Sequence, residues 1–414
     1  MAVEQHATVV GAGIIGVTCA IYLQRAGYRV TLLDGRPPGT ACSYGNAGII
    51  APGACIPLAM PGIWRQIPGY LLDPLGPLSI RWQDGFRHFP WLMAWLRSSS
   101  VERVRSISVA MRALHRSSLT EFKSLLDDVG APELLSRVGQ LYVSAKPDGA
   151  KGTPLATELR RQAGVETRLL LGEEVRELEP ALATTIVSGL YFPDNGHTTN
   201  PHRLVTHLAN SVVQRGGEIV PLNATGFQVE GDKVTAVSSE KGAIPSGLVV
   251  IAAGSWSHRL AAMLGTKVPL VAERGYHMML PDPSGAPRVP LINLDHGYAV
   301  TPMEEGLRIS GTVEIADVDA PADSRRATKL LALGKAMLPS IQGDGATTWM
   351  GARPSLPDGL PVIDRSPHFP NVLFAFGHSH YGVTGCAVTG RLVGELAAGQ
   401  PTFIDQRPYA LRKF

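Results

Sequence analysis

The chain has 414 residues, of which 44% are hydrophobic and 18% charged, and its formal net charge is +3. The length favours two closely packed domains, and the composition is that of a globular protein, which excludes a disordered or fibrous chain. A charge so close to zero gives no indication of a nucleic-acid partner, although a small anionic substrate would suit a locally basic pocket.

Cysteine use and the first residues predict a cytoplasmic protein. The sequence contains no CxxC pair and no Cys/His ligand spacing, so we expect reduced thiols and no metal site. Glu4 and His6 stand where a signal peptide would need apolar residues, so we expect no such peptide. The four cysteines are Cys19, Cys42, Cys55 and Cys386.

Residues 7–33 predict a strand, a turn, a helix and a second strand. Residues 7–10 are apolar, and the apolar residues that follow the turn recur with helical spacing. Gly27 ends the helix and residues 28–33 form the next strand, which completes a βαβ unit. The turn matches GxGxxG through Gly11, Gly13, Ile14, Ile15 and Gly16.

This unit has the features of a dinucleotide-binding site. Gly11 permits a tight turn, Gly13 lets a pyrophosphate approach the backbone, and Gly16 lets the helix pack closely on the strand. The helix N-terminus faces the phosphate charge. Asp34 ends the second strand, where a carboxylate binds ribose hydroxyls and repels the extra phosphate of NADP. The motif alone does not separate FAD from NAD.

The following segment favours FAD. Residues 37–64 contain no charged side chain but five prolines and five glycines, so they predict an ordered loop and no membrane-spanning helix. Within them, residues 43–48 offer small and amide side chains that can pass beside a pyrophosphate and a flavin. Residues 57–96 are rich in Trp (Trp64, Trp82, Trp91, Trp95), and we expect them to pack between the domains; the alternative is an apolar surface that meets a membrane or a partner.

The rest of the chain alternates between two sheets. Residues 101–129 predict one long amphipathic helix, and residues 201–215 predict a helix capped by Asn200. Gly231 and Asp232 mark a hairpin, and residues 248–253 form an apolar strand typical of the centre of a parallel sheet. Further strands are predicted at residues 141–143, 190–192, 276–280, 299–302, 307–312 and 372–376, the last followed by a glycine-rich turn and a helix around residues 388–397.

Six blocks of sequence carry a resemblance to a known family. They are residues 9–34, residues 43–48, Ile251-Ala252-Ala253-Gly254, Gly351-Ala352-Arg353-Pro354, Asp358-Gly359-Leu360-Pro361 and Gly377-His378. With these blocks the chain resembles, over nearly its whole length, the D-amino acid dehydrogenase and glycine oxidase branch of the D-amino acid oxidase family. The resemblance implies an α/β fold with a Rossmann-like FAD-binding domain of the GR2 type, and an α+β substrate domain built on an antiparallel sheet. We expect the first domain to comprise residues 1–56, 200–265 and 349–414, and the second residues 57–199 and 266–348.

The resemblance also implies the flavin contacts. Ser43, Asn46, Ala47 and Gly48 would line the ribityl and isoalloxazine path, and Gly254 would lie near the dinucleotide. The C-terminal turn would cap the pyrimidine end of the flavin through Gly377, His378, Gly382, Val383 and Thr384. Some relatives attach flavin to a cysteine in this region, but Cys386 falls inside the expected final helix, so we expect non-covalent FAD.

Four residues are expected to form the substrate site. Arg353 occupies the family's carboxylate-binding position, where a guanidinium can bind a carboxylate through two hydrogen bonds. Tyr298 would donate its hydroxyl to the same carboxylate, and His296 would line the pocket; the alternative is a core tyrosine with an exposed hairpin histidine. His380 stands where a relative carries Arg, and it would accept a hydrogen bond from the substrate amine or hold a side-chain hydroxyl.

The predicted function is oxidation of a small D-amino acid by hydride transfer from Cα to the flavin, with electrons passed to a quinone or another carrier. Oxidation of a secondary amine such as sarcosine, D-proline or hydroxy-D-proline, oxidation of glycine, and an oxidase reaction with oxygen remain open. A different class is a non-catalytic FAD-binding subunit of a hetero-oligomeric amine dehydrogenase, and an NAD dehydrogenase is a further alternative. The sequence leaves open the oligomeric state and a peripheral contact with the inner face of a membrane.

Overall fold

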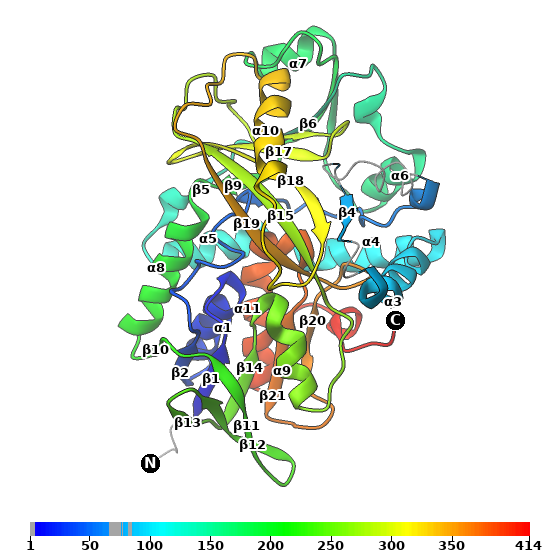
Figure 1. Ribbon diagram of the computed structural model, residues 1–414. Coiled ribbons are helices and arrows are strands. Elements are labelled where there is room, and N and C mark those ends of the chain that lie inside the picture. The colour runs from blue at the N-terminus through cyan, green and yellow to red at the C-terminus, as the bar shows by residue number, and fades with distance from the viewer. Residues whose placement is uncertain (1–4, 66–75, 77, 82–84) are drawn as a thin grey trace.

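The structure is a computed structural model that describes residues 5–65, 76, 78–81 and 85–414 (Figure 1). Two large sheets dominate it, a six-stranded sheet in the lower half of the view and a nine-stranded sheet in the upper half. Two small three-stranded sheets accompany them. Of the Trp-rich segment, Trp82 and residues 66–75 lie outside the described residues.

The six-stranded sheet is of the Rossmann type. Five of its strands are parallel, and only one edge strand, residues 362–365, runs antiparallel to its neighbour, residues 372–376. The order across the sheet is β10 (Glu218–Val220), β2 (Arg29–Leu33), β1 (His6–Val10), β14 (Leu248–Ile251), β21 (Val372–Phe376) and β20 (Val362–Arg365). The apolar strand expected at residues 248–253 is confirmed as a central strand of this sheet, between β1 and β21.

Helices α1 (Ile14–Arg25), α8 (Pro201–Gln214) and α11 (Gly382–Ala397) pack with the Rossmann strands around one apolar core. Asn200 caps α8 as expected, because its side chain accepts a hydrogen bond from Arg203 N–H at 2.9 Å. The hairpin expected at Gly231 and Asp232 is also confirmed, and it belongs to the small sheet β11 (Ala224–Glu230), β12 (Lys233–Ser239) and β13 (Gly242–Pro245).

The single long helix expected over residues 101–129 is wrong. The chain forms two helices there, α4 (Val101–His115) and α5 (Ser118–Asp128). Ser117 leaves the helical conformation with ψ near 3°, just after the buried His115 at the end of α4, whose Nδ1 donates to the carbonyl of Ala54 at 3.2 Å. The helical spacing of apolar residues continues on both sides of the break, so the pattern alone does not reveal it.

The nine-stranded sheet is mixed. The antiparallel strands expected from residues 276–280, 299–302 and 307–312 are confirmed, but residues 291–293 pair parallel with residues 141–143, and residues 78–80 pair parallel with residues 313–315. All of residues 347–355 pair with residues 271–279. The nine-stranded sheet therefore continues past residue 349, where we expected the FAD-binding domain to resume. The strands are β19 (Thr347–Ser355), β15 (Val271–Leu280), β18 (Gly306–Ile315), β17 (Tyr298–Met303), β16 (Leu291–Asn293), β6 (Gln140–Ser144), β8 (Ser188–Phe192) and β7 (Arg168–Leu171), with β4 (Leu78–Ile80) beside β18.

The remaining elements complete the two halves. The second small sheet joins the two halves, because the strand at residues 49–50 pairs with residues 196–197, which in turn lie in a strand that pairs with residues 135–136. It consists of β3 (Ile49–Ile50), β9 (Gly196–Thr198) and β5 (Leu135–Ser136). The other helices are α3 (Gly85–Arg97), α6 (Pro154–Gln162), α7 (Glu173–Leu178), α9 (Ser257–Met263) and α10 (Ser324–Met337). Among the helices described, none is long and apolar enough to span a bilayer.

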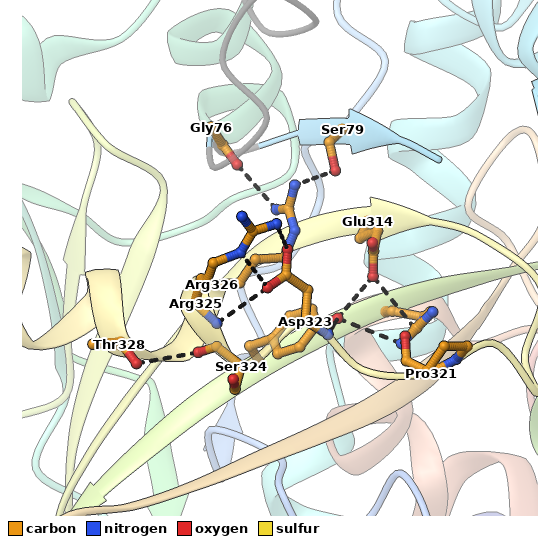
Figure 2. Close-up of polar contacts among 11 residues, drawn as sticks. Gly76, Ser79, Glu314, Pro321, Asp323, Ser324, Arg325, Arg326 and Thr328 are labelled. Atoms are coloured by element: carbon orange, nitrogen blue, oxygen red, sulfur yellow. Dashed lines mark hydrogen bonds and ion pairs between the residues drawn. The ribbon is translucent and has the colours of Figure 1, made fainter. Parts of the chain in front are cut away.

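A buried polar network holds one face of β15 and β18 to the start of α10 (Figure 2). Tyr276 donates its hydroxyl to Glu314 at 2.7 Å and accepts the N–H of Asp323 at 3.1 Å. The fully buried Arg274 lies 3.4 Å from the same Glu314 carboxylate and donates to the carbonyl of Pro321 at 2.8 Å. This network fixes the middle of β15, whose opposite face carries the candidate site.

Arg326 extends this anchoring to β4. Its guanidinium donates to the carbonyl of Gly76 at 3.3 Å and to the hydroxyl of Ser79, so α10 is joined to the strand drawn above it in Figure 2. Arg326 is almost completely buried, and these hydrogen bonds offset the cost of burying its charged guanidinium. The end of β18 is therefore held both by β4 and by the start of α10.

Candidate active site

A cavity of about 400 Å³ lies where the carboxyl ends of β1, β2 and β14 meet β19 and the turn before α11. Ligands of open α/β sheets bind at this edge, outside the carboxyl ends of the strands. Twelve of the residues expected from the sequence line it: Gly11, Gly13, Ile14, Ile15, Asp34, Ser43, Asn46, Gly254, Arg353, His378, Gly382 and Val383.

The three glycines of the N-terminal motif have different surroundings. Gly11 has φ near 112°, and a Cβ there would overlap the carbonyl of Ala252. A Cβ at Gly16 would overlap the carbonyl of Gly11, so Gly16 serves the packing of α1 on β1. At Gly13 the nearest protein atom to a Cβ would be the Ser43 hydroxyl, 3.5 Å away. Packing therefore explains Gly11 and Gly16, whereas Gly13 leaves space that opens into the cavity.

The start of α1 is suited to an anion. Its first turn contains no acidic residue, and Gly13 at the N-cap supplies no side-chain hydrogen bond. Ser43 accepts the N–H of Ile14 at 3.0 Å, which places a hydroxyl beside the helix terminus. The N-terminus of a helix attracts negative charge through its free N–H groups and its dipole, so this site fits a pyrophosphate.

Asp34 is held in place at the end of β2. Its two carboxylate oxygens accept the N–H groups of Ala12 at 2.8 Å and Arg36 at 2.9 Å. A carboxylate has about four acceptor positions, so two remain for ribose hydroxyls. The Arg36 guanidinium lies 4.4 Å from the centre of the Trp256 ring, and both residues line the cavity, which gives this part a planar aromatic surface next to a cation.

Residues 43–48 form a loop that is fixed to the nine-stranded sheet. Arg308 of β18 donates to the carbonyls of Tyr44 at 3.0 Å and Asn46 at 2.6 Å, and burial lowers the pKa of this arginine to about 10. Asn46 accepts the N–H of Gly48 through its side chain at 2.8 Å. These contacts hold the loop against the sheet on one side while Ser43 and Asn46 line the cavity on the other.

Arg353 crosses from β19 over two neighbouring strands. Its guanidinium lies over Gly275 of β15, where a Cβ would overlap it, and Nη1 donates to the carbonyl of Thr312 on β18 at 3.4 Å. Thr312 has φ near 59°, and the pairing of β18 with β15 is interrupted at this point. Such a bulge turns a backbone group out of the regular ladder, and here the carbonyl that it presents receives Arg353.

The same face of β15 and β19 carries further polar and aromatic side chains. Residues paired directly across antiparallel strands point to one face. His277 and Trp349 stack with ring centres 5.1 Å apart, and His277 Nδ1 donates to the carbonyl of Gly45 at 3.2 Å. Burial is the main cause that lowers the pKa of His277 to about 4, so this ring is neutral. The cross-strand pairs on this face are Glu273 with Arg353, Gly275 with Gly351 and His277 with Trp349.

The turn before α11 is attached to the end of β19. Ser355 pairs with His378 through a backbone bridge, and its hydroxyl donates to Ser379 Oγ at 3.1 Å. Ser379 has φ near 48°, a conformation that is uncommon outside glycine and that occurs at functional sites. Its Oγ lies 3.1 Å from Nδ1 of His380. The buried His378 ring bonds the Thr389 hydroxyl at 2.8 Å, and burial together with His115 lowers its pKa to about 3.

Eight expected residues do not line the cavity. Gly48 and Gly377 have positive φ and are packed against Thr198 and Leu356, and Thr384 ties α11 to Ile49 and Ala51. His380 lies beside the lining residue Ser379, and burial, with a further contribution from the charge of Arg353, holds its pKa well below the usual value. The full set is Gly16, Ala47, Gly48, Gly377, Thr384, His380, Tyr298 and His296.

Tyr298 and His296 are not brought to the cavity, contrary to the expected carboxylate-donor and pocket roles. The Tyr298 hydroxyl donates to the carbonyl of Leu333 on α10 at 2.7 Å, and its ring belongs to the apolar core of the large sheet. His296 is exposed in the turn before β17. The structure thus shows a core tyrosine and an exposed hairpin histidine, the alternative that the sequence left open.

Residues 6–396 match the family DAO, described as FAD dependent oxidoreductase. The chain belongs to the DAO family of FAD dependent oxidoreductases. Membership confirms the family, the enzyme class and the FAD cofactor expected from the sequence. A D-amino-acid oxidase of Bradyrhizobium diazoefficiens is 38% identical over 417 residues, covering 99% of both chains. A D-amino acid dehydrogenase of the same organism is 31% identical over 407 residues, covering 96% of both.

Solved structures confirm the fold of this DAO family member. Glycine oxidase from Geobacillus kaustophilus superimposes with a TM-score of 0.73 at 19% identity, covering 99% of this chain and 100% of that one. L-proline dehydrogenase from P. horikoshii gives a TM-score of 0.71 at 22% identity, covering 98% and 96%. The open space at Gly13, the acid-free start of α1 and the fixed Asp34 carboxylate are the features of this chain that fit FAD.

Sequence reasoning missed several residues of the site. Cys42, Arg36, Trp256 and Ser379 line the cavity, and Glu273 lies beside Arg353. Glu273 and Gly275 were detectable only as a Glu-Arg-Gly run within an apolar strand, since no motif links them to Arg353, which follows about 80 residues later. Their role becomes visible only through the pairing of β15 with β19.

Proposed function

We propose that this FAD dependent oxidoreductase oxidises a small D-amino acid at Cα. The observation that carries the proposal is the placement of Arg353, a guanidinium that lines the cavity with no ion pair to a carboxylate within 4 Å among the described residues. A free guanidinium beside a flavin cavity is suited to bind a substrate carboxylate. The names of the two Bradyrhizobium relatives support D-amino acids as the substrate class.

The chain's own residues bind and orient the substrate. Arg353 holds the carboxylate, while Gly275 and the Thr312 carbonyl fix the guanidinium. His380 lies close to Arg353 and offers a neutral imidazole to the substrate amine. FAD, held without a covalent link beside Gly13, Ser43 and Asp34, would supply the acceptor for the hydride from Cα. Holding the substrate in a fixed orientation beside the flavin would supply much of the acceleration.

The reaction is tested by adding amino acids to the purified yellow protein without oxygen and following loss of the flavin absorbance. D-alanine and other small D-amino acids should bleach the flavin, and L-amino acids should not. Bleaching by D-proline, sarcosine or glycine alone would favour a secondary-amine or glycine enzyme. If no amino acid bleaches the flavin of the isolated chain, the proposed reaction is wrong and a role as a subunit of a larger dehydrogenase gains support.

We also propose a membrane quinone as the electron acceptor, with a peripheral contact at the inner face. Trp64 and Phe89 are each 58% exposed, and the Arg65 guanidinium lies 5.2 Å from the Trp64 ring centre. Exposed aromatic rings, one of them beside an arginine, are suited to a surface that rests on an anionic bilayer. The chain should sediment with vesicles containing phosphatidylglycerol, and the double variant Trp64→Ala, Phe89→Ala should not. Equal sedimentation of both proteins, or rapid turnover with oxygen, would contradict this part.

A further inference from the structure

We propose that Glu273 is a positioning residue that directs His380 to take the proton of the substrate ammonium group. Glu273 is a carboxylate with 5% exposure on β15, directly opposite Arg353 on β19. Its Oε2 atom has no hydrogen-bond partner in the described part of the chain, and it lies 3.6 Å from Nδ1 of His380. The inference rests on the proposed function, because it requires an amine substrate held by Arg353.

A buried carboxylate without a full set of hydrogen bonds needs an explanation. The groups that face Glu273 are the Arg353 guanidinium, the His380 ring and the Ser355 hydroxyl. The pKa of Glu273 is raised above its ordinary value, because the effect of burial outweighs the lowering effects of Arg353 and then Ser355. The carboxylate thus lies between a cation that binds substrate and an imidazole that is 28% exposed. This arrangement gives Glu273 two partners that both act on the substrate.

The position of Glu273 selects one tautomer of His380. Nδ1 faces two acceptors, the Glu273 carboxylate and the Ser379 hydroxyl, and an ionised carboxylate is the stronger acceptor. With the proton on Nδ1, the lone pair is on Nε2, which no hydrogen bond from the described residues engages. Movement of about 0.5 Å closes the contact to hydrogen-bond length, and such contacts commonly shorten when substrate binds.

Proton transfer from the substrate must come before hydride transfer. An ammonium group has no lone pair, so hydride cannot leave Cα until one N–H bond breaks. The proton passes to Nε2 of His380, and the electron pair of that bond remains on nitrogen. That electron pair then forms the C=N bond as the Cα–H bond breaks. The two electrons of the Cα–H bond leave with the hydride, for which the flavin of the proposed reaction would be the acceptor. Glu273 stabilises the imidazolium, which Arg353 alone would repel.

The variant Glu273→Gln tests this role, because it keeps the shape and removes the charge. The rate of anaerobic flavin reduction by D-alanine should fall about 100-fold at pH 7. The difference in this rate between wild type and Glu273→Gln should become smaller towards pH 10, where the substrate amine is already neutral when it binds. Binding of benzoate, a carboxylate without an amine, should be unchanged because Arg353 is intact. A deficit that is equal at every pH, or no deficit, would overturn the proposal.

Two further variants complete the design. His380→Gln should reproduce the pH profile, and the double variant should lose no more than the single ones, since the two residues act as a unit. Glu179→Gln is the matched control, because Glu179 is also a buried carboxylate. It accepts the backbone N–H groups of Ala181 and Arg288 and does not line the cavity. It should leave the pH profile unchanged. If neither D-alanine nor any other amino acid reduces the wild-type flavin, the proposed function itself is wrong. If wild type is active but the variants lack the expected pH profile, only the role of Glu273 is wrong.

Discussion

The guanidinium group of Arg353 lies directly over the backbone of Gly275, in space that any side chain at that position would occupy. Gly275→Ala should therefore displace the guanidinium without removing it, at a cost of about 1–3 kcal/mol that appears mainly as a higher KM. Steady-state kinetics with D-alanine measures the effect. Gly226→Ala is the control, because a Cβ there meets nothing closer than 4.0 Å. Equal KM values for wild type and Gly275→Ala would mean that Arg353 does not bind substrate in the observed position.

Arg353→Lys keeps the charge but loses the two parallel N–H groups. We expect KM to rise about 100-fold, with a smaller change in kcat and with flavin still bound, because a lysine cannot bind a carboxylate in the bidentate manner. The absorption spectrum reports the bound flavin and kinetics report KM. Unchanged kinetics would remove Arg353 from the substrate site.

Gly13 and Gly16 should respond differently to the same substitution. A Cβ at Gly13 has space within the protein, so Gly13→Ala should fold with near wild-type stability of the apoprotein while FAD affinity falls at least 10-fold. A Cβ at Gly16 overlaps the Gly11 carbonyl, so Gly16→Ala should lower the free energy of unfolding by several kcal/mol, on the order of a severe overpacking change. Flavin titration and urea unfolding of the apoproteins separate the two effects. Equal behaviour of the two variants would show that Gly13 does not face the cofactor.

His378 makes the folded state sensitive to acid. Its folded pKa of about 3 lies below the ordinary 6.5, so the unfolded chain binds more protons between these values. The stability from this residue is fully present above pH 6.5 and falls by about 1.4 kcal/mol for each pH unit below it, until pH 3. Urea unfolding from pH 7.5 to 4.5 should therefore show a shallower loss for His378→Gln than for wild type. His296→Gln, at an exposed position, should follow wild type; parallel curves for all three would contradict the assignment.

FAD should leave the protein on acid precipitation. Cys386 is fully buried in α11, where burial raises its pKa to about 12, and it does not line the cavity. Cys42 does line the cavity, but burial raises its pKa as well, which disfavours the reactive thiolate. We expect a colourless pellet and a yellow supernatant. A yellow pellet would indicate a covalent bond, and its loss in Cys42→Ser would locate that bond.

The Rossmann half was predictable because its signals are local. The strand, the glycines, the helix and Asp34 follow one another within 30 residues, and each has one physical role. The substrate side was not predictable in the same way. Tyr298 was expected at the cavity from a local resemblance, but a strand has two faces, and its face is decided by the helix α10 that packs on it.

The break between α4 and α5 was missed for a related reason, because apolar residues with helical spacing continue on both sides of the turn. Glu273, Gly275 and Thr312 become neighbours of Arg353 only through strand pairing and a bulge. Neither this long-range strand pairing nor this bulge leaves a mark in a single sequence.

The cavity walls come from three stretches of chain: residues 10–46, 223–263 and 352–383. A ligand in contact with all three crosslinks them without a covalent bond, and it favours the folded chain in proportion to the logarithm of its concentration. Cellular flavin supply would then govern how long each newly synthesised copy survives proteolysis. During riboflavin starvation the abundance of this enzyme should fall before its remaining molecules lose activity.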